Sequence, residues 1–154
     1  MAEGHPGSGR RRRRMAGHGT VHDADAAVRR LLRERVGDPI VLYRFGSSVA
    51  GAIRSDSDLD YAVLANRPLE AVERFELQED MARALRRSVD LVDLRRASAV
   101  MRMQVVASGV AVAVGDATER ERFEIFAYAS YTRLNEERRA ILDQIAEERT
   151  VYGR

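Results

Sequence analysis

The chain has 154 residues, of which 45% are hydrophobic and 32% charged, a composition typical of one globular domain with a substantial core. No apolar run is long enough to span a membrane, and the basic N-terminus is not followed by the apolar stretch of a secretory signal. Cysteine is absent, which excludes disulfides, thiolate metal sites and cysteine nucleophiles and makes the cytoplasm the expected compartment. Lysine is absent too, which excludes a Walker-type phosphate lysine and Schiff-base chemistry.

The net charge of +2 is unevenly distributed. Arg10 to Arg14 and one acid, Glu3, give residues 1–14 a charge of +4, so the rest of the chain carries −2. The basic segment could make weak contacts with nucleic-acid phosphates, or it could be a leader ahead of a second start at Met15. Its Gly, Arg and Ser content predicts a disordered arm over residues 1–20 in either case.

From there, helical and strand patterns alternate along the chain. In chain order we expect a helix over 23–36, a strand over 40–45, a short helix over 47–53, a strand over 58–64, a helix over 69–87, a strand over 89–94, a helix over 98–106, a strand over 110–114 and a closing helical region. The apolar face of the helix 69–87 carries Val72, Phe75, Met81 and Leu85. Ser98 can cap the helix that follows it, and Thr118 and Glu121 have capping-box spacing at the start of the closing helical region. Strands separated by helices predict an α/β (α+β) fold, a small mixed sheet flanked by helices. We expect a core over 21–115 and a C-terminal helical extension over 116–154 that packs on the core or on a partner.

The most informative motif is Gly46-Ser47, followed after ten residues by Asp58-Leu59-Asp60. Side chains in a strand alternate between faces, so the two carboxylates should point the same way, about 6–7 Å apart. Two negative charges at that separation repel each other unless a cation lies between them. Oxygen-only ligands favour a hard dication such as Mg²⁺.

A third carboxylate is expected on the strand 89–94, which offers Asp90 and Asp93 on opposite faces. We favour Asp90, because an acid near the start of an apolar strand needs a functional reason to be there. Asp93 remains the alternative, although it is more simply explained as a strand-end acid that faces water. With two Mg²⁺ ions, such a set could clamp the attacking and leaving oxygens of a nucleotidyl transfer.

The Gly-Ser pair has a different expected role. Glycine lets the backbone approach a phosphate closely, and a helix that begins at Ser47 would present free N–H groups to an anion. We therefore assign nucleotide binding to Gly46, Ser47, Ser48 and Arg54. Arg44, like Arg54, could reach a triphosphate or could be solvated.

This combination of motifs resembles the DNA polymerase β-like nucleotidyltransferase superfamily. Within it, the chain is similar, from about residue 22 onward, to the minimal nucleotidyltransferases (MNT) that serve as antitoxins beside HEPN-domain toxins. The family's carboxylates fall on Asp58, Asp60 and Asp90. The resemblance implies that residues 21–115 form a nucleotidyltransferase core that uses Mg²⁺ and ATP. It also implies transfer of AMP to a tyrosine of a partner toxin, an RNase, and this modification silences the toxin. The chain could form a hetero-oligomer with that toxin.

One departure and two alternatives accompany this resemblance. Many relatives carry Arg or Lys between the Gly-Ser pair and the next glycine, whereas here Ser48-Val49-Ala50 offers no positive charge. The chain could instead neutralise its toxin by binding alone, with idle carboxylates, or could modify a small-molecule hydroxyl. Tyr128 and Tyr131 could pack within the helical tail or form a docking surface for the toxin.

Overall fold

The computed structural model describes residues 20–49 and 57–152. Its elements are, in chain order, α1 (Val21–Val36), β1 (Val41–Phe45), a single 3₁₀ turn η1 (Gly46–Ser48), β2 (Leu59–Leu64), α2 (Ala71–Leu85), β3 (Val89–Asp93), α3 (Ala99–Ser108), β4 (Val110–Val114) and α4 (Ala117–Tyr152). The order and type of the elements match the sequence prediction. Residues 1–19 of the expected arm, residues 50–53 of the expected short helix, and Arg54 lie outside the described residues.

The four strands form one mixed sheet in the order β3-β2-β1-β4. β1 runs antiparallel to both β2 and β4, while β2 and β3 are parallel. All five residues of β1 are buried, because the strand lies between β2 and β4 and helices cover the sheet. This arrangement confirms the predicted small mixed sheet flanked by helices.

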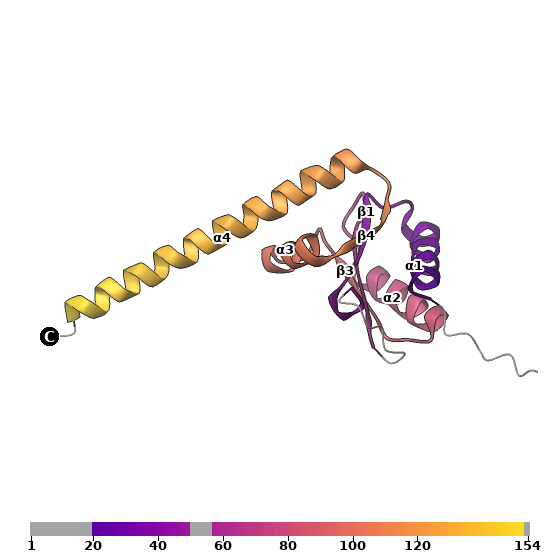
Figure 1. The fold of residues 1–154 in the computed structure, drawn as a ribbon, viewed down its shortest axis with the longest axis horizontal. Helices are drawn as coiled ribbons and strands as arrows, with labels where there is room; N and C mark the ends of the chain where they lie inside the picture. The colour runs from indigo at the N-terminus through magenta and orange to yellow at the C-terminus, as the bar shows by residue number, and fades with distance from the viewer. Residues whose placement is uncertain (1–19, 50–56, 153–154) are drawn as a thin grey trace, which may run out of the picture.

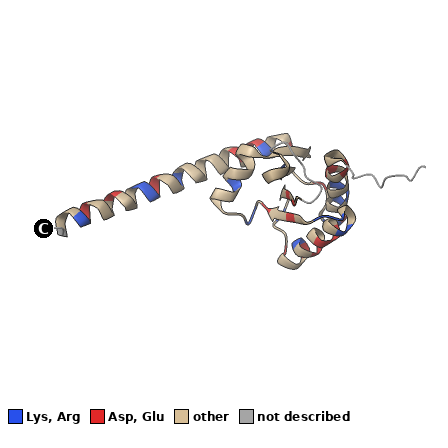
Figure 2. Ribbon diagram, turned by 60° about the horizontal axis from the view of Figure 1, so that its bottom comes forward, with Lys and Arg blue, Asp and Glu red and all other residues tan. Residues whose placement is uncertain are grey.

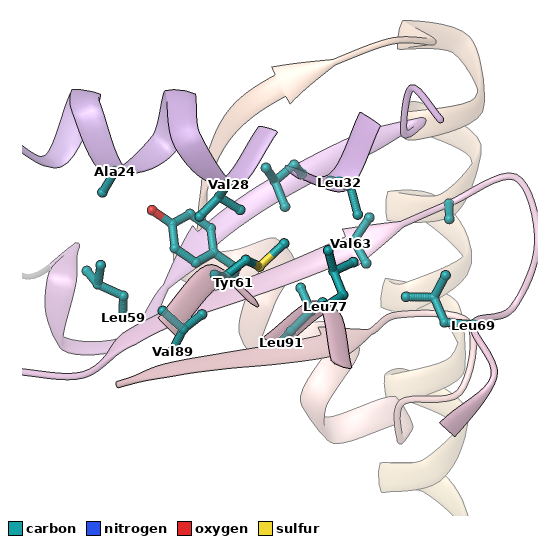
Figure 3. Packing of buried hydrophobic residues seen from close by; sticks show 13 residues of the cluster. Ala24, Val28, Leu32, Leu59, Tyr61, Val63, Leu69, Leu77, Val89 and Leu91 are labelled. Carbon is teal, nitrogen blue, oxygen red and sulfur yellow. The ribbon is translucent and has the colours of Figure 1, made fainter. Parts of the chain in front are cut away.

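Helices cover both faces of the sheet (Figure 1). α1 and α2 pack on one face, where alternate residues of β2 and β3 contact the apolar stripe of each helix. Figure 3 shows this cluster. It contains, among others, Val28, Leu32, Leu59, Tyr61, Val63, Leu77, Met81, Val89 and Leu91. α3 and the start of α4 pack on the other face, over Tyr43, Phe45, Ala62 and Leu64. The period of two in the strands therefore divides the core into two layers.

Capping side chains set two helix starts differently from the prediction. α1 begins at Val21, two residues early, because Thr20 and Asp23 form a capping box. α4 begins at Ala117, where Asp116 Oδ1 accepts the Glu119 N–H at 2.9 Å. The predicted capping box of Thr118 and Glu121 is therefore wrong, since the carboxylate that leaves β4 reaches the free N–H groups first. Ser98 does cap α3, as predicted.

Apolar residues on two helices lie outside the core. Of the four residues predicted for α2, Met81 is buried and Leu85 is partly buried, as expected, but Val72 and Phe75 are exposed. Leu77, which was not predicted, is the second buried residue of this helix. α4 is one helix of 36 residues, about 54 Å long, and residues 135–151 are all exposed. Figure 1 shows α4 running past α3 and away from the sheet. Among the described residues, no helix is both long and apolar enough to cross a bilayer.

Candidate active site

The sheet register brings two of the predicted carboxylates together. Asp60 on β2 pairs with Asp90 on the parallel strand β3, and with Phe45 on β1. Residues paired across neighbouring strands point to the same face, so the Asp60 and Asp90 side chains stand side by side. Asp58 lies just before β2 and is exposed, as is Asp90. The side chains of Asp58, Asp60 and Asp90 therefore lie together at one end of the sheet.

Gly46 connects the Gly-Ser turn to these carboxylates. Its φ of +71° lies in the left-handed region, which favours glycine. A Cβ at this position would overlap the Asp60 carboxylate oxygen and lie 3.1 Å from Asp60 Cγ. The backbone of the turn therefore lies directly against Asp60, and only a residue without a side chain fits. The two motifs, ten residues apart in sequence, form one site.

The electrostatics of this site favour a cation. Burial raises the pKa of Asp60, and the negative charges of Asp90 and Asp58 raise it further. Asp60 therefore lies close enough to Asp58 and to Asp90 for their charges to act on it. A positive ion between them would relieve that repulsion.

The donor set fits Mg²⁺. All three predicted ligands are carboxylates, and oxygen is the ligand atom that Mg²⁺ prefers. In the part of the chain that the structure describes, no three acid, His or Cys side chains are close enough to form a complete metal site. Asp58 and Asp90 are exposed, however, so their side chains have room to turn toward Asp60.

Asp93, the alternative third carboxylate, has a different environment. It is only 4% exposed, so the expectation that it faces water is wrong. Its two oxygens accept the backbone N–H groups of Leu69 and Arg95, each at 2.9 Å. Asp93 thus holds the segments before α2 and after β3 in place, while Asp90 is the acid that joins Asp60. The argument that favoured Asp90 as the embedded acid was also wrong, since Asp90 is the exposed one.

A buried network behind the turn was not predicted. Arg44, expected to be solvated or to reach phosphate, is only 9% exposed, and its Nε donates to Asp25 Oδ1 at 3.0 Å. Its Nη1 donates to the carbonyl oxygen of Ser48 at 2.8 Å, so Arg44 supports the Gly-Ser turn from below. The hydroxyl of Tyr61 donates to the same Asp25 oxygen at 2.7 Å. Two features of the sequence could have indicated this network: Arg44 stands inside an apolar strand, and Asp25 stands next to the apolar stripe of α1.

The Tyr61 hydroxyl stays protonated at neutral pH and therefore remains a hydrogen-bond donor in this network. Burial raises the pKa of Tyr61, and its hydrogen bond to Asp25 raises it further. The phenol therefore stays protonated and Asp25 accepts from both neighbours.

The two serines of the turn differ in their surroundings. Ser47 is exposed. Ser48 is buried, and its hydroxyl donates to the carbonyl oxygen of Phe45 at 3.1 Å. A hydroxyl available to a ligand is therefore found on Ser47, and Ser48 closes the turn. Only the 3₁₀ turn of the expected short helix falls within the described residues.

Comparisons with known proteins agree with this geometry. Residues 28–118 match the family model described as polymerase beta, nucleotidyltransferase. The protein adenylyltransferase MntA of Shewanella oneidensis is 40% identical over 116 residues, which are 75% of this chain and 83% of that protein.

Two solved structures extend the comparison. A chain in the crystal structure of a toxin–antitoxin with AMP-PNP matches with a TM-score of 0.71 and 37% identity, over 79% of this chain and 98% of that one. A chain in the complex of the tri-AMPylated Shewanella oneidensis HEPN toxin with the MNT antitoxin matches with a TM-score of 0.67 and 35% identity, over 80% and 96%. This chain therefore belongs to the polymerase β nucleotidyltransferases, among the minimal nucleotidyltransferases related to MntA.

Proposed function

We propose that this protein is an antitoxin that acts as a protein adenylyltransferase. It transfers AMP from ATP, with Mg²⁺, to a tyrosine hydroxyl of a cognate HEPN-domain RNase toxin and so silences the toxin. The observation that carries the proposal is the contact of Gly46 with Asp60, beside Asp90, in a chain related to a protein adenylyltransferase. A related toxin–antitoxin structure contains AMP-PNP, and another contains an AMPylated HEPN toxin, which supports ATP and a protein acceptor.

In the proposed reaction, the phenol oxygen of the toxin attacks the α-phosphorus of ATP. A bond forms between that oxygen and phosphorus, and the bond from the α-phosphorus to the oxygen that bridges to the β-phosphate breaks, so that pyrophosphate leaves. Asp90 takes the phenol proton as general base. Because Asp90 is exposed on the edge strand of the sheet, a side chain of a large protein acceptor can reach it.

The other residues position and neutralise the triphosphate. Asp58, Asp60 and Asp90 would hold the Mg²⁺ ions, two in number, which when bound neutralise the charge of the phosphates. The Gly46 backbone and Ser47 would contact the phosphates directly. Ser48 would contribute through the turn that it closes, and Arg54 would approach the phosphates from the segment after the turn.

The experiment that tests the proposal is intact-mass spectrometry of the toxin. The toxin is incubated with this protein, ATP and Mg²⁺, and the expected result is a mass increase of one or more AMP units, located on tyrosine by fragmentation. Asp60→Asn should slow the transfer by about 10²-fold or more, because the substitution removes a carboxylate from the cation site. Glu34→Gln, an exposed acid on α1, is the matched control and should transfer normally.

Two outcomes would contradict this function. If Asp60→Asn binds and neutralises the toxin as well as wild type does, neutralisation occurs by occlusion without catalysis. If AMP accumulates on a small-molecule hydroxyl and the toxin remains unmodified, the acceptor has been assigned wrongly.

The two acids of β3 allow a sharper test. Asp90→Asn should slow transfer as strongly as Asp60→Asn does, with an unfolding midpoint close to that of wild type, since Asp90 is exposed. Asp93→Asn should instead lower the unfolding midpoint, because it weakens one buried and one partly buried hydrogen bond. If Asp93→Asn alone abolishes transfer in a fully folded protein, Asp93 is the third carboxylate.

A further inference from the structure

The second half of α4 exposes apolar side chains far from the candidate active site. Ile141, Leu142 and Ile145 are 58%, 65% and 44% exposed and lie within two turns of each other. Figure 1 shows this part of the helix clear of the sheet and of the other helices. A single helix in water gains no stability from burial, so such residues are costly unless something covers them.

These residues continue a stripe that packs on the body of the protein. In the first half of α4, Ala127 is buried and Tyr131 and Leu134 are partly buried. The same alternation of three and four residues leads on to the distal stripe, which we define as Arg138, Ile141, Ile145 and Glu148. Such spacing is the seam of a coiled coil, so the distal stripe has the pattern of a helix–helix interface. All four of its residues are exposed.

The distal stripe is symmetric about Asp143. Ile141 and Ile145 each lie two residues from this centre, while Arg138 and Glu148 each lie five residues from it. If two copies of the helix run antiparallel with Asp143 at the crossing, Ile141 of each copy meets Ile145 of the other. In the same register, Arg138 of each copy meets Glu148 of the other, and the two Leu142 side chains lie next to each other across the axis.

The charges of Arg138 and Glu148 favour the antiparallel orientation over the parallel one. Arg138 and Glu148 cannot pair within one helix, because ten residues separate them by about 15 Å. Glu148 accepts a hydrogen bond from Gln144 Nε2 at 3.2 Å on the same helix, and Gln144 is uncharged. A parallel in-register pair would place Arg138 against Arg138 and Glu148 against Glu148, which is repulsive.

We propose that the distal stripe of α4 pairs with the same stripe of a second copy of this chain, in an antiparallel two-helix interface. This proposal is independent of the proposed catalytic function. The projection of α4 leaves room for it, because the bodies of the two copies would lie at opposite ends of the paired helices (Figure 1). Figure 2 shows positive and negative residues alternating along α4, as a charge-paired helix surface requires. Since the overlap is short, the dimer depends on concentration and on salt.

Charge reversal on the distal stripe tests the pairing. Sedimentation velocity of the full chain over a concentration series should show a monomer–dimer equilibrium for wild type. R138E and E148R should each raise the dissociation constant by about tenfold or more, because each creates two like-charge contacts. The double variant R138E/E148R restores both contacts and should dimerise within about threefold of wild type. R139E, which changes the adjacent residue off the stripe, is the matched control and should behave as wild type.

A cross-link tests the orientation. Because the chain has no cysteine, L142C and R149C each introduce a single thiol at equivalent positions of the seven-residue repeat. In the antiparallel pair the two residues at position 142 lie about 3 Å apart along the axis, and the two at position 149 about 18 Å apart. A short bis-maleimide should therefore link L142C and leave R149C monomeric.

Three outcomes would overturn the proposal. Wild type could remain monomeric throughout the concentration series. Both cysteine variants could cross-link equally, which indicates a parallel pair. The chain could remain monomeric while E148R loses binding to the HEPN toxin, which would assign the distal stripe to the toxin.

Discussion

The central strand β1 and the second half of α4 are stabilised in opposite ways. Every residue of β1 is buried, and the strand is paired on both sides, with β2 and with β4. Residues 135–151 of α4 are all exposed, and the helix there is held by its own backbone hydrogen bonds. One region depends on contacts distant in sequence and the other on contacts within the helix. The carboxylates of the candidate site therefore lie in or beside β2 and β3, which belong to the same sheet as β1, whereas the surface proposed to bind another chain lies on α4.

The charged residues of the two regions differ in the same way. Arg44 and Asp25 form a nearly buried ion pair in which both side chains have further hydrogen-bond partners. Arg133 and Glu137 on α4 form an exposed pair whose nitrogen and oxygen are 4.0 Å apart. Buried pairs are costly to break because one charge is left without a partner, whereas exposed pairs are replaced by water.

Breaking these two ion pairs should give the largest contrast. Asp25→Ala leaves the buried Arg44 guanidinium without its counter-ion and the Tyr61 hydroxyl without its acceptor, and should lower the free energy of unfolding by about 3–5 kcal/mol. Glu137→Ala, the matched control on α4, should lower it by less than about 1 kcal/mol. Urea unfolding followed by circular dichroism measures both. Equal losses in the two variants would show that the network behind the Gly-Ser turn is not a buried support.

Truncating one leucine in each region should give the next largest difference. Leu77 on α2 is fully buried, so Leu77→Ala should lower the free energy of unfolding by about 2–5 kcal/mol. Leu142 on α4 is 65% exposed, and Leu142→Ala should change the free energy by no more than about 0.5 kcal/mol at concentrations where the chain is monomeric. Thermal unfolding of dilute samples checks this. A large loss for Leu142→Ala under those conditions would mean that the distal helix packs on its own body.

The smallest effect concerns Asp60 and pH. The pKa of Asp60 is raised in the folded protein, so the folded state holds this proton more tightly than the unfolded state does. With respect to Asp60 alone, the folded state is therefore most stable relative to the unfolded state at low pH, where the Asp60 carboxyl group is protonated. Its negative charge lowers the free energy of unfolding once the pH has risen through the pKa of Asp60 in the unfolded state and then through its higher pKa in the folded state. Asp60→Asn should be more stable than wild type at neutral pH, and this gain should shrink as the pH falls toward 3.8, the ordinary pKa of an aspartate.

Unfolding midpoints of both proteins across this pH range give the measurement. A gain that stays constant with pH would show that the substitution acts through packing. A loss of stability at neutral pH would contradict the raised pKa.

Local patterns in the sequence were sufficient for the order and type of the elements. Apolar runs predicted the buried strands, and the period of the helices predicted their positions to within a few residues. The same reading pointed to Gly46, Asp58, Asp60 and Asp90. Such features are readable because secondary structure and turn chemistry depend on residues that are close in sequence.

Only the tertiary structure decided which charged groups meet. Asp25 and Arg44 are nineteen residues apart, and their pairing depends on how α1 lies across the sheet. The roles of Asp90 and Asp93 were judged from their flanking residues, but β3 turned Asp90 toward Asp60 and buried Asp93 against the segment before α2. Burial and charge pairing are set by neighbours from other elements, which a local pattern does not contain. For the same reason, the sequence alone predicted a helical tail, while the structure showed that its second half projects from the body with one apolar face uncovered.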